Sequence, residues 1–187
     1  MSNFKKWAAT ASAACLLLSL SVAPLFSQTA AEQKQPQAKT KAEYDAYMAL
    51  YSEAAPAKKV ELAVKFLADH PETEFKMFVY QMQIDSYARL GNVEKVVETG
   101  EKLLAIEPKD LPCLLTLSSI LPERLPAEGD KKAAQLDKAL DYANRAKTEI
   151  EGLQKPAQIT DELWTAEKNK LLATVNSSID LVNKNRR

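Results

Sequence analysis

Two stretches of this chain repeat the same helical spacing of large residues, and this repetition constrains the fold more than any other feature. Each stretch holds two patterns with large residues at i, i+4 and i+7, the spacing that places side chains on one face of a helix. The matching positions lie 36 residues apart: Tyr44, Met48, Tyr51, Val60, Val64 and Leu67 in the first, and Tyr80, Ile84, Tyr87, Val96, Gly100 and Leu103 in the second. Gly100 is the one member of the two sets without a large side chain. A shared offset across two helical hairpins predicts a repeat protein in which hairpins stack side by side.

Turn signals separate the expected helices. Pro56 suits the first turn of a helix, where its missing N–H would have no partner. The residue before Pro71 is pushed out of the α region, so a helix should end there. Gly91 marks the turn inside the second hairpin, and Pro108 closes that hairpin.

A third hairpin follows with a longer connection. Its first helix carries Leu114, Leu117, Ser118 and Leu121, 34 residues after the matching positions of the second repeat. Its second helix, expected over residues 131–153, has a seam of small residues at Ala139, Ala143 and Ala146 that comes later than the repeat spacing demands. Three turn-forming residues predict that the extra residues form a surface loop: Pro122, Pro126 and Gly129.

A last helix begins near Thr160 or Asp161, either of which can cap it. Its polar positions are Asn176, Ser177, Asp180 and Asn183. Such a polar face is typical of a helix that caps a stack of repeats, and this is the preferred interpretation. The alternative is the first helix of a shortened fourth repeat.

The second hairpin resembles the tetratricopeptide repeat family. Tyr80 stands for the first aromatic of the family pattern, Tyr87 for its tyrosine, Gly91 for the turn glycine and Pro108 for the closing proline. Other positions depart from the family pattern: Gln83 and Ile84 replace its Leu-Gly pair, Val96 replaces an alanine, and Gly100 replaces a packed aromatic. The second hairpin is therefore a diverged copy of the repeat. The resemblance implies an all-α, right-handed α-solenoid of about three repeats plus a C-terminal helix over residues 42–187. Gly100 predicts looser packing, because glycine inside a helix costs about 1 kcal/mol relative to alanine.

The resemblance also implies a groove, lined by the first helix of each hairpin, that holds a peptide or a partner helix. The groove positions carried over are Phe78, Gln81, Asp85, Ala88 and Arg89 in the second repeat, Ala42, Asp45, Ala49, Ser52 and Glu53 in the first, and Leu115 and Ser119 in the third. The Lys and Asn residues with which family members clamp a carboxylate are missing, and Arg89 is the one groove cation. A mixed polar and acidic groove would suit a neutral or basic segment. The tyrosines at helical spacing are expected to pack between helices.

The N-terminal segment has the pattern of a secretory signal peptide. Lys5 and Lys6 precede an apolar run over residues 7–26, and small residues near position 31 suit cleavage. An uncleaved anchor is the alternative. Residues 32–41 are expected to form a disordered tether. The protein is therefore expected to be exported, periplasmic or secreted, without a stable membrane span, and removal of residues 1–31 leaves 23 basic against 25 acidic residues and no general attraction to nucleic acid.

Groups that perform chemistry are sparse in the sequence. Cys113 is the single cysteine after residue 31 and stands in an apolar stretch, where a buried thiol is expected, and His70 is the single histidine, expected in an exposed loop. No catalytic residue, cofactor or metal ligand is therefore expected. The sequence favours a non-enzymatic scaffold or adaptor that binds a peptide or protein. The alternatives are a structural subunit of a cell-envelope assembly and an accessory domain of a separate enzyme.

Overall fold

A computed structural model describes residues 36–123 and 129–187, and these residues form helices without strands. The expected signal peptide over residues 1–31 and the first part of the expected tether lie outside them. The helices are α1 (Lys41–Ser52), α2 (Pro56–Asp69), α3 (Lys76–Arg89), α4 (Val93–Ile106), α5 (Leu111–Glu123), α6 (Asp130–Gly152) and α7 (Asp161–Asn185). The predicted all-α class is confirmed.

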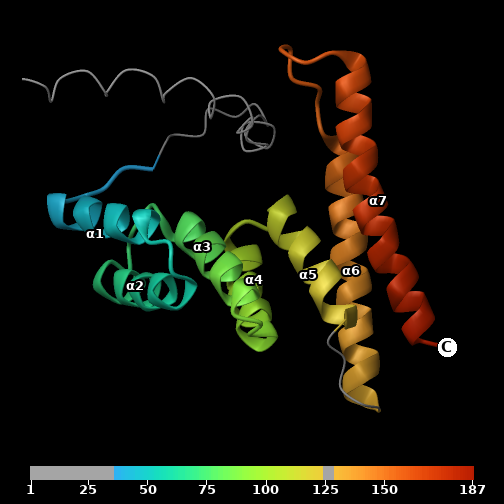
Figure 1. The fold of residues 1–187 in the computed structure, drawn as a ribbon, viewed down its shortest axis with the longest axis horizontal. Coiled ribbons are helices and arrows are strands. Elements are labelled where there is room, and N and C mark those ends of the chain that lie inside the picture. Colours follow the sequence, from blue (N-terminus) through green and yellow to red (C-terminus); the bar gives the residue numbers. More distant parts are fainter. Residues whose placement is uncertain (1–35, 124–128) are drawn as a thin grey trace, which may run out of the picture.

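Helices that follow one another in the sequence pack against one another. Each of the first six contacts the next, and α7 contacts both α6 and α5. Figure 1 shows α1 with α2 and α3 with α4 as successive pairs, followed by α5 beside the two long helices α6 and α7. The expected hairpins are thus present, and α7 lies against both helices of the third one.

Local sequence signals explain where several helices begin. Thr40 accepts the N–H of Glu43 at 3.1 Å, Asn92 accepts the N–H of Lys95 at 3.1 Å, and Thr160 accepts the N–H of Leu163 at 3.3 Å. Each bond satisfies one of the backbone donors that a helix leaves free at its N-terminus. Gly91 has a φ of 68°, a conformation that glycine adopts without strain, and this explains the turn between α3 and α4. The prediction of a cap at Thr160 is confirmed.

The apolar core is divided into two clusters. The smaller one lies between α1, α2 and the start of α3: Leu50, Ala63, Phe66, Phe75 and Val79. The larger one joins α3 to α7 and includes the small-residue seam of α6, where Ala139, Ala143 and Ala146 are fully buried as the sequence predicts. Helix α3 links the two clusters, because Val79 belongs to the first and Ile84 to the second.

Gly100 lies where α4 and α5 approach closely, and the expectation of looser packing there is wrong. A Cβ atom at this position would lie 3.0 Å from both Cδ atoms of Leu117 and 3.2 Å from Sγ of Cys113. The Cys113 thiol also donates to the Gly100 carbonyl at 3.5 Å. The missing side chain therefore allows the two helices to pack more tightly than any larger residue would.

Most of the surface loop predicted in the third hairpin falls on residues 124–128, outside the described residues, but Pro122, expected in this loop, lies in α5. Helix α5 continues through Pro122 to Glu123, and α6 has 23 residues where α2 and α4 have 14 each. Two distant side chains satisfy backbone carbonyls at the end of α5: Gln135 donates to the Leu121 carbonyl at 2.8 Å, and Asn185 donates to the Pro122 carbonyl at 2.9 Å. Pro126 lies outside the described residues.

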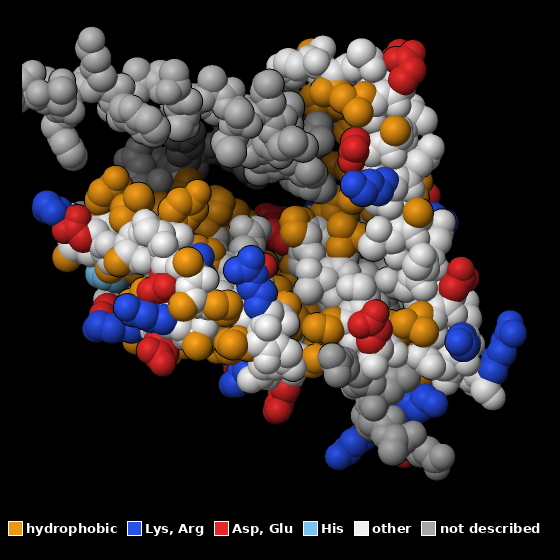
Figure 2. Space-filling view, in the orientation of Figure 1, with side chains coloured by type: hydrophobic (Ala, Val, Ile, Leu, Met, Phe, Trp, Pro, Cys, Tyr) orange, Lys and Arg blue, Asp and Glu red, His pale blue; other side chains and the backbone are white. Residues whose placement is uncertain are grey.

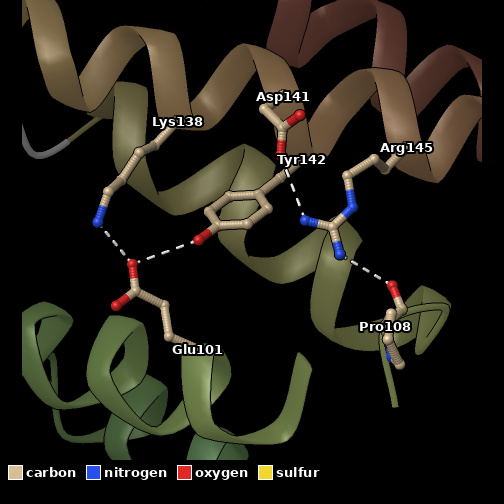
Figure 3. Close-up of polar contacts among 6 residues, drawn as sticks. All are labelled: Glu101, Pro108, Lys138, Asp141, Tyr142 and Arg145. Atoms are coloured by element: carbon tan, nitrogen blue, oxygen red, sulfur yellow. Dashed lines mark hydrogen bonds and ion pairs between the residues drawn. The ribbon is translucent and has the colours of Figure 1, made fainter. Parts of the chain in front are cut away.

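Polar contacts join α6 to α4 and to the turn that follows α4 (Figure 3). The Glu101 carboxylate accepts from Lys138 Nζ at 2.7 Å and from the Tyr142 hydroxyl at 3.3 Å. Arg145 donates to the Pro108 carbonyl at 2.9 Å, and its guanidinium lies 5.6 Å from the centre of the Tyr142 ring. Burial, together with the charge of Glu101, raises the pKa of Tyr142 to about 12. The second and third hairpins are therefore joined by a bridge between their second helices.

Candidate functional site

Helix α1 is rotated relative to the predicted orientation. The sequence predicts that Tyr44, Met48 and Tyr51 pack in the core, but these side chains are 53%, 37% and 63% exposed. The buried positions are instead Glu43 and Leu50. Glu43 faces inward because its carboxylate accepts the N–H of Lys39 at 2.6 Å while its own N–H is bonded to Thr40, a reciprocal capping arrangement.

Residues 36–40, the described part of the expected tether before α1, are held in place by contacts with the rest of the chain. Gln37 donates its N–H to the Glu74 carboxylate at 3.0 Å, and Lys39 donates its ammonium to the Glu72 carbonyl. Ala38 packs against the smaller core cluster. Residues 36–40 therefore turn back along α1 and contact the loop between α2 and α3 (Figure 1), because backbone and side-chain bonds anchor them there.

Rings and one thioether gather on this side of α1. The Tyr47 ring stacks on Phe75 with centroids 4.1 Å apart and lies 6.4 Å from the Tyr51 ring. We name the exposed or half-buried residues Tyr44, Tyr47, Met48 and Tyr51, with Phe75 beneath them, the α1 aromatic surface. All of these residues except Tyr51 line a cavity of about 500 Å³, which Pro36 also lines. Figure 2 shows hydrophobic side chains gathered along α1.

A second depression lies between α3 and α5, with a volume of about 210 Å³. Three predicted groove residues line it, namely Gln81, Asp85 and Ala88, together with Asp110 and Thr116. We name it the α3–α5 depression. The Gln81 amide donates to the Asp110 carboxylate at 2.7 Å, and the other oxygen of Asp110 accepts the N–H of Cys113 at 2.8 Å, which caps α5. Burial raises the pKa of Asp110, against the effect of these two hydrogen bonds.

The remaining predicted groove residues are more scattered. Arg89 is exposed and pairs with Asp85 at 3.4 Å, and Phe78 is half-buried. On α1, Asp45 is exposed and pairs with Lys41, and Ala49 is exposed; neither lines the cavity beside this helix. Ala42 and Ser52 are also exposed, and Glu53 is half-buried.

The predicted positions on α5 contribute little to either hollow. Ser119 is half-buried and donates to the Thr116 carbonyl at 3.0 Å, and Leu115 is half-buried as well. The structure thus brings together the α3 positions and adds Asp110 and Thr116, which sequence reasoning missed. The sequence-based prediction also missed the exposure of the α1 tyrosines. The signal that could have revealed it is the TKAE capping pattern at residues 40–43, which turns Glu43 inward.

Reactive groups do not converge in the described part of the chain. Cys113 is buried, as predicted, and burial raises the pKa of its thiol to about 12, so the nucleophilic thiolate is disfavoured. His70 follows α2 in the connection to α3, as predicted, but it is half-buried with its ring 5.0 Å from that of Phe66, so the expected exposure is wrong. Within residues 36–123 and 129–187, no three His, Cys, Asp or Glu residues are placed to hold a metal ion.

Two further findings bear on identity. None of the helices in the described ranges has the length and apolar character needed to cross a membrane. Comparison of the chain with protein-family models, with curated proteins and with solved structures gave no match.

Proposed function

We propose that this protein is an exported, non-enzymatic interaction module, a scaffold or adaptor that binds a peptide or partner protein through the α3–α5 depression. The helical hairpins would stack as a right-handed solenoid of the tetratricopeptide kind. The repeated spacing of large residues supports this arrangement, and so does the packing of α7 on both helices of the third hairpin.

The observation that carries the proposal is the origin of the residues around the depression. Apart from Leu103 of α4 and Asp110, which directly precedes α5, they come from α3 and α5, the first helices of two successive hairpins. In a stack of hairpins, the first helices share one face, so a ligand that contacts both would run across repeats. Gln81 and Asp110 join the two helices through a hydrogen bond, which keeps the walls at a fixed distance.

The charges around the depression favour a neutral or basic ligand. Asp85 and Asp110 line it, and no lysine or arginine in the described part of the chain does. Arg89, the one groove cation expected from the sequence, is already paired with Asp85. A partner cation could replace Arg89 at Asp85, because an exposed ion pair of this kind is worth only about 0.2–1 kcal/mol.

Changing Asp85 and Arg89 together to alanine is expected to weaken partner binding by about tenfold or more, the loss of about 1.4 kcal/mol of contact energy. Both side chains are more than half exposed, so the fold should be kept. The measurement is recovery of crosslinked partners from the protein's own cells.

The matched control is the double change of Lys65 and Asp69 to alanine. These residues form an exposed ion pair of the same i, i+4 spacing on α2, far from the depression in sequence. The control is expected to keep the partner. Equal recovery with both double variants would contradict binding through the depression.

A structural subunit of an envelope assembly is the second candidate. Val64 on α2 and Ile106 on α4 are 53% and 51% exposed, and both lie on second helices, the outer ones of a stack. Permanent packing of these helices on another subunit would cover them. This candidate predicts that a partner stays bound when the depression is altered and is released when Val64 and Ile106 are changed to serine.

A further inference from the structure

We propose that the α1 aromatic surface binds an extended, proline-containing peptide. This surface lies at a different site from the α3–α5 depression, so the inference does not depend on the function proposed above. Its ligand class follows from the side chains that form it and from the segment of this chain that lies beside it.

The geometry of the rings suits a proline-rich ligand. Tyr44 and Tyr51 lie about two helical turns apart on the same face of α1, and Met48 stands between them. Tyr47 is fixed below by its stacking on Phe75 at 4.1 Å, with the ring planes at 19°. Aromatic-lined grooves of this kind bind proline-rich segments, whose preformed extended backbone loses little entropy on binding.

The chain itself places a proline at this surface. Pro36, Gln37 and Ala38 lie outside any helix and line the cavity together with Tyr44, Tyr47 and Met48. The segment is held by backbone bonds to Glu43 and Glu74. A peptide from a partner would lie along the rest of the cavity of about 500 Å³ that this segment lines.

The charges at this site favour a neutral ligand. Among the described residues, Lys41 is the one charged residue that lines the cavity, and it pairs with Asp45 at 2.5 Å. Binding would therefore come from apolar and aromatic contacts, and should change little with salt concentration.

The test uses the purified protein with a ten-residue polyproline peptide, and a glycine-serine peptide of the same length as the reference ligand. Titration calorimetry is expected to show binding of polyproline and at least tenfold weaker binding of the reference. Changing Tyr44 and Tyr51 together to alanine should weaken polyproline binding by about tenfold, the effect of removing two aromatic contacts. Both side chains are more than half exposed, so their loss leaves the core in place.

The control changes Ala42 and Ala49 together to serine, because both are exposed on α1, have the same spacing as Tyr44 and Tyr51, and do not line the cavity. It should bind polyproline as the unchanged protein does. Equal binding of the two peptides, or unchanged affinity in the tyrosine variant, would overturn the proposal. A further contradicting result would be a protein that sediments as a dimer while the tyrosine variant sediments as a monomer. The surface would then be an interface between two copies of the chain. Binding to phospholipid vesicles that is lost in that variant, without polyproline binding, would overturn it as well.

Discussion

Replacing Gly100 with leucine is expected to lower the free energy of unfolding by about 3 kcal/mol or more, the upper part of the range for overpacked cores. The new side chain would enter a space where even a Cβ atom lies 3.0 Å from Leu117 and 3.2 Å from Cys113. Leu117 is fully buried and Cys113 is 2% exposed, so neither can move aside into solvent. Chemical denaturation monitored by circular dichroism measures the change.

Gly152 provides the control for Gly100. It lies at the end of α6, and a Cβ atom there would have no neighbour within 4 Å. Gly152→Ala should leave stability unchanged or raise it by up to about 1 kcal/mol, because alanine favours the helix. Full stability of Gly100→Leu would show that α4 and α5 do not approach as closely as described.

Replacing Glu43 with alanine is expected to lower the free energy of unfolding by about 2 kcal/mol, because the change removes a helix cap and leaves a hydrogen-bond donor unpaired. The side chain is 2% exposed and accepts the N–H of Lys39 at 2.6 Å. Glu74→Ala removes a similar bond, from the Gln37 N–H at 3.0 Å, at an exposed position. It should cost less, and equal losses in the two variants would contradict the role assigned to burial.

The contribution of Glu43 to the free energy of unfolding should depend on pH. The Thr73 hydroxyl, the Lys39 N–H and the charges of His70 and Lys39 hold the pKa of Glu43 below its ordinary value of 4.5, against the effect of burial. Because the folded pKa is the lower one, the stabilisation is present above pH 4.5 and is lost as the pH falls through the folded pKa. The difference in stability between the protein and Glu43→Ala should therefore shrink below pH 4.5. A difference that stays constant down to acid pH would show that the charge of Glu43 does not contribute.

The helices could be predicted from the sequence because their signals are local. Periodic apolar residues, Gly91 and Pro56 each act within a turn or two of the chain, and the structure has helices where these signals place them. The seam at Ala139, Ala143 and Ala146 was also predictable, since three small residues at helical spacing have few uses other than close packing.

The orientation of α1 could not be read from the same signals. The set Tyr44, Met48 and Tyr51 and the set Glu43 and Leu50 have the same helical spacing, one residue apart. Apolarity favours the first set, and the energy of a buried, hydrogen-bonded cap favours the second. The close packing of α4 and α5 at Gly100 could not be predicted either, because it depends on Leu117 in the next helix and not on helix propensity alone.

The candidate site was predictable only in part. Gln81, Asp85 and Ala88 follow from the register of α3, which the resemblance supplied. Asp110 was missed because it lies just before α5, in the turn that follows α4, and its approach to Gln81 is set by the packing of two hairpins. The predicted α1 positions Asp45 and Ala49 depended on the register that the structure revises.

Site-specific photocrosslinking tests most directly whether this protein binds a partner through the face shared by α3 and α5. A photoreactive phenylalanine derivative would replace Ala88, which is exposed and lines the depression, and in a second sample Glu61, which is exposed on α2. After irradiation of the producing cells, a covalent adduct is expected at position 88 and not at position 61, and it should disappear when Asp85 and Arg89 are changed to alanine. An adduct at position 61 alone, or at neither position, would contradict the proposed function.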